Sequence, residues 1–188
     1  MIRPAILTFV AAAALFAADT PGPQIPRKAP ELTMRLPGKQ IQLSQYKGYI
    51  CVLAVMSTTC PHCQKLATVL SLLQPEYAPK GVQMLGLVVN PEATTEMENF
   101  ARTYARGMFP VGMTTDAIAG EFLQHPPGMH YFPMIAFIDK NGVIRGEHLG
   151  ATDPTFFDEK TESQNIRAEL EKIFKEPTLA APGAAKKK

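Results

Sequence analysis

Short apolar runs, separated by turns rich in glycine and proline, dominate the hydrophobic pattern of this 188-residue chain. Residues 31–36 and 39–43 alternate apolar and polar positions on either side of a Pro-Gly pair, which predicts a β-hairpin. Residues 49–56 are continuously apolar and end at polar residues, and residues 82–89 form a second, mostly apolar run. Such short runs are typical of strands buried on both faces of a sheet.

Apolar residues at helical spacing fill the intervals between these strands. A helix is expected after residue 60, and Pro75 should kink or end it, because proline has no backbone N–H to donate. Thr95 and Glu98 have the spacing of a capping box, which predicts that the second helix begins there. The remaining helices are expected at residues 116–122 and 166–174.

The order of these elements predicts an α/β fold. Strands separated by helices pair in parallel through right-handed crossovers. By contrast, residues 134–138 and 143–149 flank Asn141-Gly142, a strong hairpin signal, and therefore add antiparallel strands. We expect a central mixed β-sheet flanked by helices, with an N-terminal β-hairpin, in one domain over residues 31–175.

The two ends of the chain differ in composition from this domain. Residues 1–18 carry one charge, on Arg3, ahead of an apolar stretch that ends in small residues, which is the pattern of a secretory signal peptide. An uncleaved anchor or a buried N-terminal helix is the alternative. Residues 19–30 hold four prolines and are expected to be an extended linker. Residues 176–188 end in three lysines and are expected to be a disordered basic tail.

Composition narrows the classes of function. Hydrophobic residues make up 46% of the chain, enough for a packed core, and the formal charge of +2 is far from that of a typical nucleic-acid-binding protein. Three cysteines do not suffice for a small fold built on disulfides. We expect an exported, periplasmic or otherwise extracytoplasmic monomer, with no nucleic-acid partner and no stable membrane span after signal cleavage.

Candidate chemistry is concentrated in Cys60-Pro61-His62-Cys63, between a buried strand and a helix. Cys60 would lie at the helix N-terminus, where free N–H groups and the helix dipole stabilise a thiolate. Pro61 suits the first helical position, and a protonated His62 would stabilise the same thiolate. Cys60 is therefore predicted to be the exposed nucleophile of thiol–disulfide exchange, and Cys63 the resolving thiol.

With Gly38-Lys39, the segment 43–48 and Phe132-Pro133, this motif resembles the thioredoxin superfamily, in particular its TlpA/ResA-like exported thiol–disulfide oxidoreductases. The resemblance covers about residues 28–175. It implies a thioredoxin fold and an enzyme that acts on protein thiols and disulfides together with a redox partner protein, and we expect no cofactor. It also implies that Pro133 is a cis-proline that holds the substrate backbone with Phe132.

The sequence departs from the family pattern around the motif. The family often has a Trp-rich lead-in, whereas this chain has no Trp and places Thr59 beside the nucleophile, so partner docking there is expected to differ. The preceding strand carries no acidic residue that could accept a proton from Cys63. The Pro-His dipeptide matches oxidising DsbA-type proteins, whereas ResA-like proteins mostly reduce, so the direction of electron transfer stays open.

Other interpretations of the cysteines stay open. The pair could form an inert disulfide or half of a zinc site, although no second pair completes a four-cysteine site. A peroxiredoxin-like thiol peroxidase would use Cys60, but its Pro-x-x-x-Thr-x-x-Cys pattern meets Leu53 and Ser57 in place of Pro and Thr.

A copper carrier would combine Cys60 and Cys63 with His130, in a loop that also holds His125 and Met129. The prediction is nevertheless that no metal is bound. Cys51 lies within a predicted buried strand, where a free cysteine usually behaves as a small hydrophobic residue.

Overall fold

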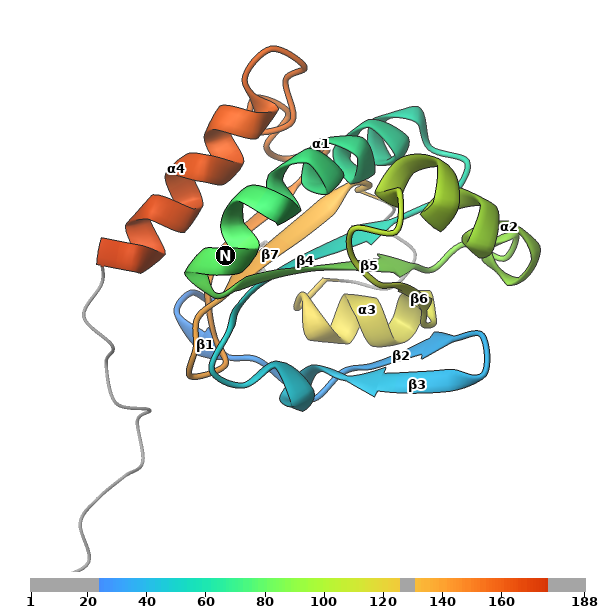
Figure 1. Cartoon of the computed structure of the whole chain (residues 1–188), viewed down its shortest axis with the longest axis horizontal. Coiled ribbons are helices and arrows are strands. Elements are labelled where there is room, and N and C mark those ends of the chain that lie inside the picture. The colour runs from blue at the N-terminus through green and yellow to red at the C-terminus, as the bar shows by residue number, and fades with distance from the viewer. Residues whose placement is uncertain (1–23, 126–130, 176–188) are drawn as a thin grey trace, which may run out of the picture.

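A computed structural model gives the structure of the chain and describes residues 24–125 and 131–175 (Figure 1). The predicted signal peptide at residues 1–18 and the predicted basic tail at residues 176–188 lie outside the described residues. So do the first residues of the predicted linker.

One mixed β-sheet runs through the described part of the chain, with its strands in the order β1-β8-β7-β4-β5-β6-β2-β3. Strands β4, β5 and β6 pair in parallel, and every other neighbouring pair is antiparallel. The strands are β1 Arg27–Lys28, β2 Thr33–Leu36, β3 Lys39–Gln42, β4 Ile50–Met56, β5 Val82–Val88, β6 Val111–Met113, β7 Met134–Ile138 and β8 Val143–Leu149.

Helices cover both faces of the sheet (Figure 1). Helices α1 (Pro61–Tyr77), α2 (Ala93–Phe100) and α4 (Glu162–Lys175) lie on one face, and α3 (Asp116–Phe122) lies on the other. No helix among residues 24–125 and 131–175 is long and apolar enough to cross a bilayer. Shorter helical segments are η1 (Leu43–Tyr46), η2 (Ala78–Lys80) and the π-helical η3 (Ala101–Ala105), which continues α2.

Strand β4 divides the core in two because its side chains alternate between the two faces of the sheet. All seven of its residues are buried. Val52 and Met56 belong to the core beneath α1 and α4, whereas Leu53 and Val55 pack with residues of α3 and of the N-terminal hairpin. Burial on both faces requires an apolar residue at every position, which explains the unbroken apolar run in the sequence.

The predicted mixed sheet with flanking helices is confirmed. Strands β2 and β3 form the N-terminal hairpin, and β7 and β8 form the second hairpin. At the turn of the second hairpin, Gly142 has φ = 76°, a left-handed conformation that glycine adopts without steric cost. The β4–β5 and β5–β6 pairs provide the predicted parallel strands.

The predicted start of the second helix is wrong. Helix α2 begins at Ala93, and the Thr95 hydroxyl donates to the backbone carbonyl of Glu92 from within the first turn. In α1, Pro75 lies within the helix, which continues to Tyr77. Proline at this position removes one hydrogen bond near the end of the helix, and α1 ends two residues later, at Tyr77.

Strand β1 is an element that the sequence analysis did not predict, because it falls within the proposed linker. Arg27 and Lys28 pair with β8. The Arg27 guanidinium lies 2.7 Å from the carboxylate of Glu147, whose side chain is fully buried. The ion pair and the strand pairing together fix the start of the domain on the sheet.

Candidate active site

The CPHC motif lies at the carboxyl end of β4, where the chain leaves the sheet and begins α1. Cys60 is the N-cap residue of α1, with extended backbone (φ = −85°, ψ = 119°), and Pro61 is the first helical residue. The Cys60 carbonyl accepts the N–H of Gln64 at 3.1 Å. Cys60 therefore occupies the position where a helix dipole and free N–H groups stabilise a thiolate.

The two sulfurs of the motif have unequal surroundings. Cys60 is half-buried, whereas Cys63 is 0% exposed, and both are free thiols in this structure. A hydrogen bond from the Cys63 side chain is the largest cause that lowers the pKa of Cys60 to about 6; the backbone N–H groups of Cys63 and His62 and the charge of His62 act in the same direction. The same hydrogen bond, together with burial, raises the pKa of Cys63 above its usual range.

In the reduced protein we expect iodoacetamide to modify Cys60 before Cys63. With its pKa at about 6, Cys60 is about half thiolate near pH 6 and mostly protonated well below it. Cys63 stays protonated and buried at the same pH. Mass spectrometry after brief exposure should show a preference for Cys60 of about 100-fold or more. Equally slow modification of both cysteines would contradict this assignment.

A polar network holds the segment that leads into Cys60. The Asn90 side-chain amide accepts the Thr58 N–H at 2.9 Å and donates to the Thr58 hydroxyl at 2.7 Å. That hydroxyl donates to Glu96 at 2.7 Å, and Gln64 donates to the Thr58 carbonyl at 2.9 Å. These hydrogen bonds therefore fix the backbone at Thr58, just before the nucleophile Cys60. In the family that the sequence resembles, aromatic residues often occupy this lead-in.

Sequence reasoning missed Asn90, Glu96 and Gln64. A signal for Asn90 existed, because it closely follows β5, and the carboxyl ends of the parallel strands β4 and β5 meet at the same edge of the sheet. Glu96 and Gln64 lie on helices, where polar residues are usual, and the sequence around them carries no comparable signal.

The Phe132–Pro133 peptide bond is cis, as the resemblance implied. The Gly150 N–H donates to the Tyr131 and Pro133 carbonyls at 2.9 Å each, which ties this segment to the end of β8. Phe132 and Cys60 line one open groove of about 560 Å³. The other lining residues are Ser57, Val89, Asn90, Pro91 and Asp116.

The remaining residues of the motif are accessible. Pro61 and His62 are exposed in the first turn of α1. Thr59 is exposed directly before Cys60, and its hydroxyl lies 3.1 Å from that of Ser57. Leu53, the position at which a peroxiredoxin pattern requires proline, is fully buried in the middle of β4.

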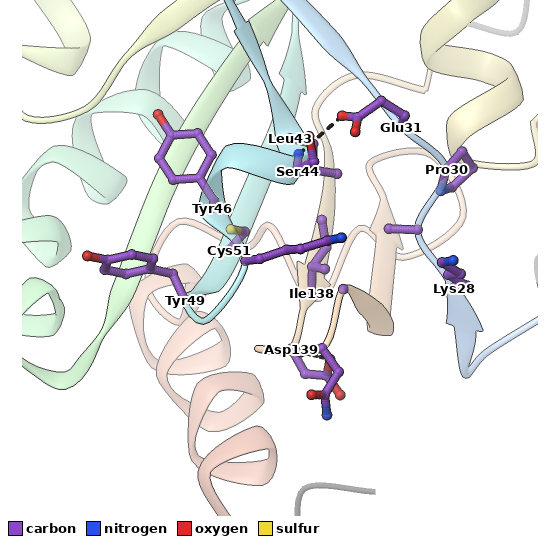
Figure 2. Close-up of a pocket in the computed structure, with 14 residues that line it drawn as sticks. Lys28, Pro30, Glu31, Leu43, Ser44, Tyr46, Tyr49, Cys51, Ile138 and Asp139 are labelled. Atoms are coloured by element: carbon purple, nitrogen blue, oxygen red, sulfur yellow. Dashed lines mark hydrogen bonds between the residues drawn. The ribbon is translucent and has the colours of Figure 1, made fainter. Parts of the chain in front are cut away.

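Cys51 lies at the opposite end of β4 from the motif, in a cavity that it shares with Tyr46, Tyr49 and Asp139 (Figure 2). Burial raises the pKa of Cys51 to about 12. Five residue steps along the strand, about 16 Å, separate Cys51 from Met56. A disulfide requires Cα atoms within about 7 Å, so Cys51 cannot pair with either motif cysteine in this fold.

The proposed metal ligands fall only partly within the described structure. Among residues 24–125 and 131–175, no group of three or more His, Cys, Asp or Glu side chains is arranged to hold a metal ion. His125 is partly buried, and burial lowers its pKa. Met129 and His130 lie outside the described residues.

Residues 25–147 match the family model described as AhpC/TSA family. The chain is 30% identical over 136 residues to a thiol-disulfide oxidoreductase ResA of Bacillus anthracis. That alignment covers 72% of this chain and 75% of the relative.

Two solved structures identify the fold. The chain is similar to a thiol:disulfide interchange protein of the thioredoxin family from Chlorobium tepidum TLS, with a TM-score of 0.58 and 21% identity over 78% of this chain and 98% of the other. It is also similar to a thiol:disulfide interchange protein from Bacteroides sp., with a TM-score of 0.59 and 15% identity over 82% and 92%. The fold is therefore the thioredoxin fold, as the resemblance implied.

Proposed function

This chain belongs to the AhpC/TSA family and is a thiol–disulfide oxidoreductase, and on that premise we propose that it exchanges disulfides with exported proteins through Cys60 and Cys63. The observation that carries the proposal is the inequality of the two sulfurs. Cys60 is accessible and has a pKa lowered to about 6, whereas Cys63 is fully buried. A thiolate that forms at neutral pH and that a partner can reach is the nucleophile this chemistry needs.

The exchange proceeds in two displacements. The Cys60 thiolate attacks one sulfur of a partner disulfide, and the partner's other sulfur leaves as a thiolate. Cys63 then gives up its proton and attacks Cys60, which forms the Cys60–Cys63 disulfide and releases the partner's second sulfur. The partner gains the two electrons that the cysteine pair loses, and the reverse sequence oxidises a partner dithiol.

The groove beside Cys60 is the proposed docking site for the partner. Phe132, which lines the groove, and the adjacent Pro133 would hold the partner's backbone, and the exposed Thr59, next to Cys60, would border the docking site. Phe132 supports this assignment because it lines the same groove as the nucleophile. With threonine rather than an aromatic residue at position 59, this border of the site is small and polar.

Export is part of the proposal. The sequence of residues 1–18 has the pattern of a signal peptide, and disulfides persist mainly outside the cytosol. The chain is proposed to work as a monomer in the periplasm or an equivalent compartment. Cell fractionation with mass measurement of the mature chain checks both the location and the cleavage.

Equilibration in glutathione buffers of graded redox ratio tests the function. The thiols of Cys60 and Cys63 should disappear together in a single two-electron transition, while Cys51 stays reduced. The midpoint gives the reduction potential, and comparison with the potential of the compartment assigns the direction of transfer. Cysteines that stay reduced over the whole range would contradict the proposal.

Two measurements on the wild-type protein distinguish the proposed function from its rivals. Turnover of hydrogen peroxide faster than disulfide exchange would favour a thiol peroxidase. Stoichiometric copper binding that protects Cys60 and Cys63 from alkylation would favour a copper carrier.

A further inference from the structure

Glu162, in the first turn of α4, is a buried carboxylate that the exchange cycle above does not use. Its side chain is 2% exposed, and its Oε2 atom has no hydrogen-bond partner among the described residues. A buried, unpaired carboxylate oxygen is costly in a folded protein, so each such group calls for a physical explanation.

Glu162 lies on the side of the sheet that holds Cys63. Cys63 shares its core cluster with Phe157 and Ile166, which flank Glu162 in the sequence. The Lys65 ammonium lies 3.0 Å from the Glu159 carboxylate and ties the segment before α4 to the start of α1. The charge of Glu162 is also among the causes that raise the pKa of Cys63, so the two groups are within electrostatic reach.

The groups that face Glu162 leave it able to exchange a proton at neutral pH. Burial raises the pKa of Glu162 to about 7, Lys65 on α1 opposes that rise, and Glu159 before α4 adds to it. The thiol of Cys63 on α1 is a further titratable group near it. A carboxyl group that titrates near the working pH suits general acid–base catalysis.

We propose that Glu162 accepts the proton of Cys63 when Cys63 resolves the mixed disulfide, and returns that proton when the oxidised pair is reduced. In the forward step the Glu162 carboxylate takes the Cys63 proton while a bond forms between the sulfurs of Cys63 and Cys60. The bond between Cys60 and the partner's sulfur breaks, and that sulfur leaves with the electron pair.

The inference rests on the proposed function, because it requires Cys63 to be the resolving thiol. Strand β4 carries no acidic residue, so the carboxylate that the sequence analysis did not find next to the motif comes from α4 instead. Its buried position also explains why an unpaired carboxylate oxygen is retained there. In solvent the pKa of Glu162 would fall back to its ordinary value, and the carboxylate would be too weak a base to accept a proton from a buried thiol.

Reduced protein mixed with dithiobis(nitrobenzoate) in a stopped-flow instrument tests the inference. Attack by Cys60 releases the first coloured thiolate, and resolution by Cys63 releases the second. In the wild type, the second rate should rise with pH through about 7, as Glu162 loses its proton. Glu162→Gln should slow the second release by about 100-fold near pH 7 and remove this inflection, while the first release stays unchanged.

Two further variants make the comparison specific. Glu171→Gln removes an exposed carboxylate from the same helix and should change neither release. Glu162→Asp keeps a carboxyl group and should restore the inflection with a smaller loss of rate. A thermal unfolding curve of each variant verifies that it is folded.

Second-release rates that agree within about twofold between wild type and Glu162→Gln at every pH would overturn the inference. So would a wild-type profile without an inflection between about pH 6 and pH 8, a result that needs no variant. Failure of the proposed function gives a different signature: the wild type would release only one thiolate per chain, or Cys60→Ala would still release both.

Discussion

Replacement of Cys63 with alanine should convert a transient mixed disulfide into an adduct that persists until reductant is added. The Cys60 thiolate still attacks the partner, but no second thiol remains to displace it. On non-reducing gels of extracytoplasmic extracts, the variant should carry at least about tenfold more covalently bound partner protein than the wild type. The adducts should vanish with dithiothreitol, and mass spectrometry should locate the linkage at Cys60.

Two variants control this trapping experiment. Cys60→Ala should trap nothing and abolish exchange, because the accessible nucleophile is gone. Cys51→Ala removes the third cysteine, at the far end of β4, and should leave both trapping and exchange unchanged. If Cys60→Ala accumulates adducts and Cys63→Ala does not, the two roles are reversed.

The pKa of Cys60 should rise from about 6 toward the ordinary thiol value of about 8.5 in Cys63→Ala. The reason is that the hydrogen bond from the Cys63 side chain is the largest of the causes that lower it. Thiolate absorbance in the ultraviolet, followed as a function of pH, measures the shift. As the pH is lowered, the rate at which an alkylating agent modifies Cys60 should therefore begin to drop at a pH about two units higher in the variant than in the wild type.

Variants of His62 complete this comparison. His62→Gln removes the ring charge, the last in order of the causes that lower the pKa of Cys60, and should change that pKa by less than about half a unit. His62→Pro also removes a backbone N–H that stabilises the thiolate and should act more strongly. A larger shift in His62→Gln than in Cys63→Ala would show that the charge of His62, and not the hydrogen bond from Cys63, is the main cause of the low pKa of Cys60.

Local sequence patterns correctly predicted those elements that a short stretch of sequence determines by itself, without contacts from distant parts of the chain. The seven-residue runs of β4 and β5 are apolar at nearly every position, and Asn141-Gly142 specifies its turn within two residues. The start of α2 was mispredicted because its first turn is set by tertiary contacts. There the Glu96 carboxylate accepts a hydrogen bond from Thr58, a residue on another element.

The same distinction holds for the candidate site. Cys60 and Cys63 are close in sequence, and the strand–helix junction around them is visible in the apolar pattern, so their placement was predictable. Glu162 comes within electrostatic reach of Cys63 only because α4 packs on α1. Acidic residues are common in the first turn of a helix because the dipole favours them there. The sequence around Glu162 therefore gave no sign of its burial.

Strand β1 covers part of a sheet edge that would otherwise be open to pairing with another strand. A long, unpaired outermost strand is a template for pairing with another copy, and the seven-residue β8 would be such a strand without β1. Arg27 and Lys28 occupy part of its free side, and the exposed Lys28 adds a charge where a second chain would approach. At the other end of the sheet, β3 is short and mostly polar. The sheet therefore presents poor templates for intermolecular strand addition on both of its outer sides.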